Sequence, residues 1–247
     1  MKNVIEPQEG EDLYALAKRC NALYICPKDD RGTRKGPLVI YAGQDELGRN
    51  FVGDIYFNFR RVEEHPRAVE AFAEIAWKKL LTQGLGNSFD TVCGIPQGGR
   101  TFGQALARIA NKRFVYADKK PKQTEEGKKQ EYVWDLTQFE FEPGERVALA
   151  EDVFNNFQNT DKTLEQIAER GVTIVLLVGA LNRSSVYDTV YTPKRDPFLG
   201  VEFPVVASIR EAFPEYRQDD GEVLGDIRNR NLETDVKRNW RTLLSLM

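Results

Sequence analysis

Apolar side chains recur at two different spacings along the middle of the chain. A proline begins the segment at residues 66–84 and a glycine ends it, and four of its apolar residues fall on one helical face: Val69, Phe72, Ala76 and Leu80. Short apolar runs then alternate with helical patterns. The runs lie at residues 89–95, 114–117, 147–150 and 172–180, and the helical patterns at residues 101–110 and 160–170. This alternation predicts a parallel sheet with right-handed crossovers.

The two flanking regions have weaker patterns. Residues 1–65 contain two short apolar runs, at 38–41 and 55–57, which predict an N-terminal hood of short strands. After residue 200 we predict a strand near 205–207 and an amphipathic C-terminal helix marked by Val236, Trp240, Leu243 and Leu244. We therefore predict an α/β fold with a Rossmann-like parallel sheet. Its core spans residues 66–200, and residues 201–247 form a C-terminal extension packed on that core.

Composition narrows the function classes. The chain has 247 residues, 41% of them hydrophobic, and a formal net charge of -3, which gives no general attraction to nucleic acid or to an anionic membrane. No apolar run approaches the roughly 18 residues that a membrane-spanning helix needs. The acidic, polar start lacks the pattern of a secretory signal. We expect a cytoplasmic protein without a nucleic-acid or membrane partner.

The cysteines and the single histidine suggest structural roles. Cys20, Cys26 and Cys93 form a sparse, odd-numbered set that fits a reducing compartment, and buried thiols are a better interpretation than a metal site. His65 precedes Pro66 at a predicted helix start, so we interpret it as a neighbour of the helix cap and not as a catalytic base.

Two adjacent acids carry the strongest chemical signal. Glu151 and Asp152 follow the apolar run 147–150, and in open α/β sheets ligands bind beyond the carboxyl ends of strands. Such a pair can accept hydrogen bonds from a vicinal diol or hold a divalent cation that carries a diphosphate. The polar segment 155–160 then enters a helix, whose N-terminal N–H groups favour a phosphate. A strand-end acid followed by a plain helix cap is the structural alternative.

Two further segments fit an anionic ligand. Residues 94–100 form a turn in which Gly98 and Gly99 let the backbone approach an anion closely, and Arg100 adds positive charge. The polar segment 119–130 is rich in lysine, and a loop of this kind can close over a polyanion. Each segment has an ordinary alternative, a common strand-to-helix turn and a solvated charged loop.

Together these segments resemble the type I phosphoribosyltransferase family, in the order found in orotate phosphoribosyltransferases. Residues 53–60 resemble the segment that leads into the family's first long helix, and residues 94–101 resemble its diphosphate-contacting turn. Lys119 and Lys122 have the spacing of lysines in the family's catalytic loop. Glu151 and Asp152 are similar to the acidic pair of the family's phosphoribosyl pyrophosphate (PRPP) motif.

The resemblance implies a Mg²⁺-dependent enzyme that transfers ribose 5-phosphate from PRPP to a nucleobase, with orotate and pyrimidine biosynthesis the nearest match. It also implies a homodimer. Lys119, Lys122 and Asp152 would be catalytic, and Mg²⁺ would be carried mainly by PRPP. The substrate-binding residues would be Gln97, Gly98, Gly99, Arg100, Glu151, Asp152, Asn155, Asn156, Asn159, Thr160 and Arg183. Arg183 stands where orotate enzymes have an arginine for the carboxylate of the base, although it could instead pair with Asp188.

Three departures from the family pattern keep other functions open. Residues 155–160 contain no glycine, whereas the family has Thr-Thr-Gly-Gly-Ser/Thr there. Asp118 and Thr124 stand where the family has a basic residue and a histidine, and the N-terminal lysine that contacts orotate has no counterpart near residues 45–48. A phosphoribosyltransferase for another base and a non-catalytic PRPP-binding regulator are therefore the alternatives.

Overall fold

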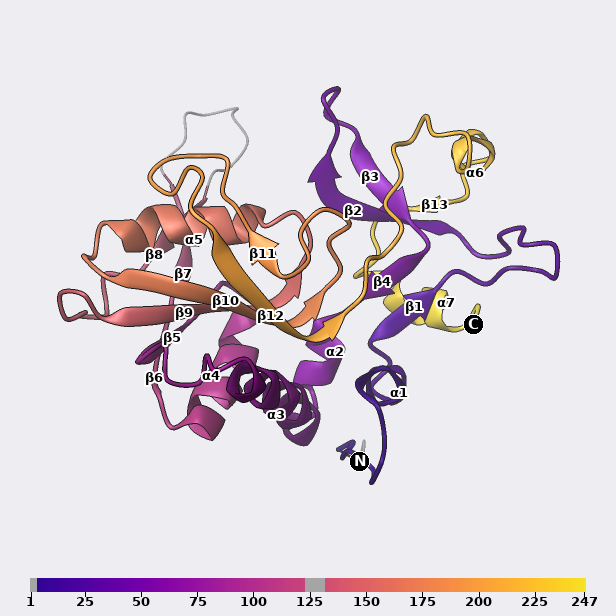
Figure 1. Cartoon of the computed structure of the whole chain (residues 1–247). Helices are drawn as coiled ribbons and strands as arrows, with labels where there is room; N and C mark the ends of the chain where they lie inside the picture. Colours follow the sequence, from indigo (N-terminus) through magenta and orange to yellow (C-terminus); the bar gives the residue numbers. More distant parts are fainter. Residues whose placement is uncertain (1–3, 123–131) are drawn as a thin grey trace.

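A six-stranded, mostly parallel sheet forms the centre of the molecule (Figure 1). The computed structural model describes residues 4–122 and 132–247. The strands are β5 (Thr91–Gly94), β6 (Arg113–Tyr116), β9 (Arg146–Phe154), β10 (Thr173–Asn182), β11 (Val190–Tyr191) and β12 (Phe203–Arg210), in the order β11-β12-β10-β9-β5-β6. All neighbouring pairs are parallel except β11 with β12. The predicted α/β fold with a parallel sheet is confirmed.

Helices cover both faces of this sheet because the strand residues alternate between two cores. On β9, Ala148 and Ala150 join the core beneath α3 (Pro66–Thr82) and α4 (Gly99–Ala110). The alternate residues of the same strand join the core beneath α5 (Gln158–Ala168). Phe72 of α3 and Phe102 of α4 are fully buried, and each such side chain contributes about 2–3 kcal/mol relative to an exposed one. No helix among the described residues is long and apolar enough to cross a membrane.

The predicted helices and strands are confirmed with shifted ends. The helix predicted from residue 66 ends at Thr82, and Gly84 follows with a φ of 72° that favours glycine. The largest difference is in β9, which continues through Phe154. Glu151 and Asp152 therefore lie within the strand and not after it, so their side chains alternate in direction along it.

The hood contains the two predicted strands, together with two helices and two strands that the sequence pattern did not indicate. The predicted strands are β2 (Leu38–Gln44) and β4 (Ile55–Phe57); the added elements are α1 (Leu13–Arg19), β1 (Leu23–Ile25), β3 (Asn50–Gly53) and α2 (Phe59–Glu63). His65 is the N-cap residue of α3, and its Nδ1 accepts a hydrogen bond from the backbone N–H of Ile5 at 3.1 Å. Its role is structural, as predicted.

The C-terminal extension differs from the prediction. The core does not end at residue 200, because β12 is an interior strand of the sheet, between β10 and β11. Phe213 still joins the core beneath α3 and α4, but the chain after it packs on the hood, where β13 (Leu232–Glu233) pairs with β2 in parallel. After α6 (Leu224–Arg228), the start of α7 (Trp240–Leu244) enters a cluster with Tyr24 and Tyr41. The C-terminal helix therefore packs against apolar residues of the hood and not against the core helices.

The lysine-rich segment is also more regular than predicted. Its first part forms β7 (Asp118–Pro121), which pairs in antiparallel register with β8 (Tyr132–Asp135). The remainder of the predicted loop, residues 123–130, lies outside the described residues. Lysines pair across these strands with an acid and with aromatic rings, as Lys120 does with Asp135 and Lys119 with Tyr132. These cross-strand pairs account for strands in a sequence of low β-propensity.

All three cysteines are free and buried. Burial raises the pKa of Cys20 to about 11 and that of Cys93 to about 12. Both thiols therefore stay protonated at neutral pH, as expected of structural cysteines.

Candidate functional site

A cavity of about 380 Å³ lies at the carboxyl ends of β5, β9 and β10. The turn after β5 forms one wall, and the end of β9 with the following loop forms the floor. The hood contributes Tyr41 and Tyr56, and the C-terminal segment contributes Lys237. This is the edge at which open parallel sheets bind ligands, because strand ends and helix N-termini converge there.

The acid pair lines the cavity with two unlike carboxyl groups. Glu151 is only 4% exposed, and its Oε1 accepts a hydrogen bond from the backbone N–H of Asp152 at 3.1 Å. Burial and the neighbouring Asp152 carboxylate raise the pKa of Glu151 well above its usual range. Asp152 is half-buried and lies at the cavity surface. Glu151 is thus the member of the pair that burial keeps neutral, and in that form it can also donate a hydrogen bond.

The glycine turn lies directly against the acid pair. A Cβ on Gly98 would collide with the side chain of Asp152, and a Cβ on Gly99 would collide with the backbone of Ala150. Gln97, which lines the cavity, follows a cis peptide bond. Its Oε1 accepts a hydrogen bond from Nη2 of Arg60 at 3.0 Å. Only glycine at 98 and 99 lets the turn approach β9 this closely.

Gly99 and Arg100 do not lie where the sequence placed them. Neither is among the described residues that line the cavity. Nη2 of Arg100 donates to the carbonyl of Ala117 at 2.7 Å and pairs with Asp118, and its Cζ lies 4.4 Å from the ring centre of Tyr116. Arg100 therefore ties α4 to the end of β6. Its charge is paired with Asp118 and does not face the cavity.

The segment at 155–160 keeps its shape without glycine. Phe157 has a left-handed backbone, with φ of 58°. Its ring is stacked between those of Phe154, at 4.7 Å, and Tyr191, at 4.2 Å. Offset aromatic pairs contribute about 0.5–1.5 kcal/mol beyond burial, which offsets much of the cost of a non-glycine residue in this conformation.

This segment also brings hydrogen-bond donors to the cavity. Asn155, Asn156, Asn159 and Thr160 all line it. The first N–H groups of α5 have no intrahelical partner and carry the positive end of the helix dipole. Thr160 is fully buried, and its Oγ1 has no hydrogen-bond partner among residues 4–122 and 132–247. The arrangement suits a phosphate group.

The two lysines of the predicted catalytic pair differ. Lys119 lines the cavity, and its Nζ lies 4.1 Å from the ring centre of Tyr132 and 5.9 Å from that of Trp134. Cation–π contacts of this kind hold an ammonium group at the rim. Lys122 is not among the described lining residues, so its catalytic role stays a prediction.

Arg183 lies at the hood end of the cavity. It is 8% exposed, and its Cζ lies 3.8 Å from the ring centre of Tyr41. The alternative pairing with Asp188 is wrong, because Asp188 pairs with Arg210. Nη2 of Arg183 lies 3.8 Å from Oε2 of Glu215, and Nη1 has no hydrogen-bond partner within the described part of the chain. Arg183 therefore keeps donor capacity that its surroundings do not use.

Sequence reasoning missed several lining residues, including Arg60, Tyr41, Tyr56 and Lys237. Burial raises the pKa of Tyr41 to about 12, so its hydroxyl stays neutral and donates to the carbonyl of Ile55 at 2.6 Å. Tyr56 and Arg60 belong to residues 53–60, a segment noted for its resemblance to the family but not for these side chains, whereas Tyr41 and Lys237 come from segments without a recognisable motif. The only feature of the sequence that could have drawn attention to Lys237 is that it is a basic residue between the apolar residues Val236 and Trp240.

Comparison with known proteins identifies the family. A model of the phosphoribosyl transferase domain matches residues 59–202, which is more than half of the chain. The chain belongs to the phosphoribosyltransferase family. The matched range contains the acid pair, the glycine turn and Arg183. Tyr41, Tyr56 and Lys237 lie outside it.

Individual relatives of this phosphoribosyltransferase also belong to that family. The orotate phosphoribosyltransferase of a Nitratiruptor species is 30% identical over 156 residues, which cover 63% of this chain and 68% of the relative. That of Helicobacter acinonychis is 25% identical over 182 residues, covering 72% and 85%. The structure of Leishmania donovani UMP synthase matches with a TM-score of 0.51 and 16% identity. The match covers 95% of this chain but 42% of that protein, and it shows a shared fold.

Proposed function

We propose that this phosphoribosyltransferase transfers ribose 5-phosphate from PRPP to orotate, giving orotidine 5′-phosphate and pyrophosphate. The observation that carries the proposal is the composition of one cavity. A helix N-terminus and an acid pair lie in the part of the cavity that the core forms. A buried arginine with an unused donor lies at the hood end. These groups match the phosphate, the ribose and the carboxylate of the two substrates.

PRPP fits along β9 and the start of α5. The N–H groups of α5 and the side chains of residues 155–160 would bind the 5′-phosphate. Asp152 would accept hydrogen bonds from the ribose hydroxyls, with Glu151 behind it as a second partner. Gln97 and the backbone at Gly98 would contact the diphosphate, and Lys119 would reach it from the opposite rim.

The chemistry needs positioning and charge compensation more than proton transfer. The bond from C1 of the ribose to the diphosphate oxygen breaks, and a bond from C1 to a ring nitrogen of the base forms. Positive charge develops on the sugar while negative charge grows on the departing diphosphate. Asp152 would lie beside the positive charge on the sugar, and Lys119 and the backbone N–H groups of the turn would lie beside the negative charge on the diphosphate. Donors fixed before the reaction stabilise such charge without reorganising.

Mg²⁺ fits the donor set of the cavity when PRPP carries it. Among the described residues, no group of three or more His, Cys, Asp or Glu side chains is arranged to hold a metal ion. Mg²⁺ is commonly bound by one or two carboxylates together with phosphate oxygens and water. Asp152 is the carboxylate that would contribute. The ion would neutralise charge on the diphosphate.

Arg183 supports a base that carries a carboxylate. A guanidinium group binds a carboxylate through two parallel hydrogen bonds, and Nη1 of Arg183 has no partner in the described structure. The Tyr41 ring behind it fixes the plane of the guanidinium group. The relatives at 25–30% identity that are named orotate phosphoribosyltransferases agree with this choice.

One observation favours the non-catalytic alternative. Phe157 occupies the position where the phosphate loop turns, and its buried ring stiffens a segment that the resemblance expects to be glycine-rich. A regulator that binds PRPP without turnover would keep the acid pair and the helix N-terminus.

Pyrophosphate release separates the two functions. The protein is incubated with PRPP and Mg²⁺, with and without orotate, and pyrophosphate is followed continuously. Repeated turnover that requires orotate supports the proposal. Calorimetric binding of PRPP without any turnover, tested on orotate, uracil and adenine, would replace it with the regulator.

A further inference from the structure

Lys237 reaches the cavity from a segment that lies outside the family match. The matched range ends at residue 202, and Lys237 belongs to the C-terminal segment that packs on the hood. It lines the same cavity as Tyr41, Tyr56 and Arg183. Besides Arg60, Lys119 and Arg183, the cavity therefore has a cation at a position that the family pattern does not specify.

Two buried side chains next to Lys237 in the sequence fix the position of its segment. Val236 is 4% exposed and Trp240 is 1% exposed, so the two residues anchor the turn in the hood. Nε1 of Trp240 donates to the carbonyl of Asn21 at 2.8 Å, and its ring lies 5.8 Å from that of Tyr56. Lys237 projects from between two buried anchors, so its backbone position is fixed.

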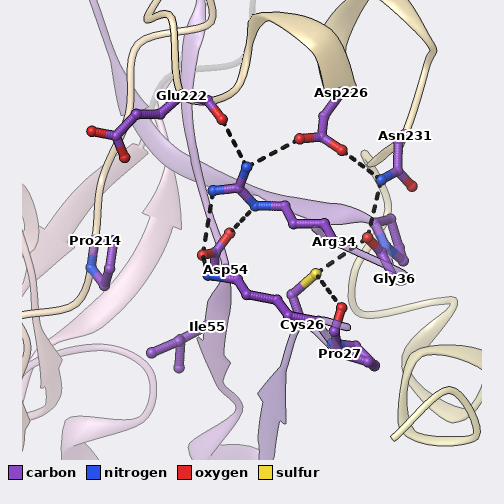
Figure 2. Close-up of polar contacts among 12 residues, drawn as sticks. Cys26, Pro27, Arg34, Gly36, Asp54, Ile55, Pro214, Glu222, Asp226 and Asn231 are labelled. Atoms are coloured by element: carbon purple, nitrogen blue, oxygen red, sulfur yellow. Dashed lines mark hydrogen bonds and ion pairs between the residues drawn. The ribbon is translucent and has the colours of Figure 1, made fainter. Parts of the chain in front are cut away.

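The preceding side is held by a polar network (Figure 2). Arg34 binds Asp54 at 2.6 Å and Asp226 at 3.1 Å, and its Nη1 donates to the carbonyl of Glu222 at 2.8 Å. Nδ2 of Asn231 donates to Oδ1 of Asp226 at 2.8 Å and to the carbonyl of Gly36 at 3.0 Å. The next residues form β13 along β2.

This β13–β2 pairing leads the chain toward the cavity. Glu233 lies opposite Val39, and the next two residues of β2, Ile40 and Tyr41, both line the cavity. Residues 222–240 thus contact the hood at their start through Arg34, in the middle through the β13–β2 pairing and at their end through Trp240. Lys237 lines the cavity together with Ile40 and Tyr41 of β2.

The charge of Lys237 is not compensated by the protein. Within residues 4–122 and 132–247, no carboxylate lies at ion-pairing distance from its ammonium group. The acids of the cavity, Glu151 and Asp152, belong to β9, where we place the ribose. An unpaired ammonium group in a cavity attracts an anion. The hood end therefore presents two cations, Arg183 and Lys237.

We propose that Lys237 is a specificity-determining residue that binds the anionic acceptor together with Arg183. The inference rests on the proposed function and adds a second cation to acceptor recognition. Arg183 would bind the carboxylate by its planar fork, and Lys237 would bind a second oxygen of the same acceptor as a point charge. An acceptor with a carboxylate and a further oxygen that gains negative charge would be favoured over a neutral base.

The test compares Lys237→Ala with Lys237→Arg and with the matched control Arg238→Ala. Arg238 is an exposed cation on the same turn and does not line the described cavity, so its removal changes net charge equally. Pyrophosphate release is measured with orotate and PRPP varied in turn. We expect Lys237→Ala to raise the KM for orotate by about tenfold or more, with the KM for PRPP within about twofold of wild type. Lys237→Arg should recover part of the loss, and Arg238→Ala should behave as wild type.

Two results would overturn the inference, and both can be told apart from failure of the proposed function. If wild type turns over orotate and Lys237→Ala has the same KM values as Arg238→Ala, Lys237 has no role in acceptor binding. If wild type shows no turnover, the proposed function fails, and calorimetry of orotate binding to the PRPP complex decides about Lys237. Binding that is lost in Lys237→Ala and kept in Arg238→Ala supports the inference. Binding that is equal in both, or absent from wild type, overturns it.

Discussion

Gly98 and Asp152 come from different strand ends and lie in direct contact, with no room for a side chain at position 98. The contact couples the turn that we place on the diphosphate to the acid that we place on the ribose.

We predict that Gly98→Ala weakens PRPP binding by about tenfold or more, because the added methyl group must push the Asp152 carboxylate out of place. Calorimetric titration with PRPP and Mg²⁺ measures the effect. Gly221→Ala is the control, since a Cβ there meets no atom within 4 Å and Gly221 does not line the described cavity. Equal affinity in the two variants would show that this contact does not order the site.

Asp152→Asn tests the acid pair directly. The amide keeps the shape of the side chain but removes the charge, and charge-assisted hydrogen bonds are worth about 1.5–3 kcal/mol each. We expect more than a tenfold loss of PRPP affinity in a protein with an unchanged unfolding transition. A folded variant with wild-type affinity would exclude Asp152 from the ribose site.

Lys119→Ala should lower kcat more than it raises the dissociation constant of PRPP, because negative charge grows on the diphosphate during the reaction. Lys120→Ala is the matched control. It is the next residue of β7, its side chain points to the other face, and it pairs with Asp135. If the two variants have the same kcat, the ammonium group of Lys119 does not act on the reaction. Lys122→Ala, measured beside them, tests the role that the family resemblance gives to Lys122.

Arg34→Ala should destabilise the hood. Burial alone would raise the pKa of Asp54, but hydrogen bonds from Arg34 and Lys28 outweigh it and hold the pKa below its usual value. Removing one partner of a buried ion pair costs about 3 kcal/mol, and the stability that a lowered acid pKa provides is present above about pH 4 and lost below it.

Urea unfolding at several pH values measures this loss. The difference between wild type and Arg34→Ala should be largest near neutral pH and should narrow as the pH falls toward 4 and below. Arg31→Ala removes an exposed cation of the same loop and serves as control. A difference between wild type and Arg34→Ala that does not change with pH would mean that Asp54 does not carry the effect.

The sequence predicted the core well because its signals are local. Helical spacing marked α3, and the continuous apolar run marked β10, so the parallel sheet followed. The end of β9 was missed because Glu151 and Asp152 are polar residues inside a strand, and polarity alone suggested that the strand had ended. Burial next to a ligand cavity is a tertiary property that periodicity cannot express.

The parts that were missed depend on contacts between distant segments. The pairing of β13 with β2 joins residues almost 200 positions apart, and Trp240 is buried by the hood and not by the core. Arg100 was predicted to lie at the cavity because it follows the two glycines. Its side chain instead contacts Tyr116, at the end of β6, and Asp118, in the hairpin that follows, and the sequence pattern did not indicate these contacts. Phe157 replaces a glycine only because Phe154 and Tyr191 stack on it.

The carboxylate preference of Arg183 tests the central claim most directly. Values of kcat/KM are measured for orotate and for uracil, which lacks the carboxylate, in wild type and in Arg183→Lys, with Arg210→Lys as a control that leaves the cavity intact. We predict that wild type strongly prefers orotate and that Arg183→Lys loses about tenfold or more on orotate alone, because lysine cannot form the paired hydrogen bonds. A wild-type protein that uses uracil as well as orotate, or an Arg183→Lys variant with an unchanged preference, would contradict the assignment of orotate.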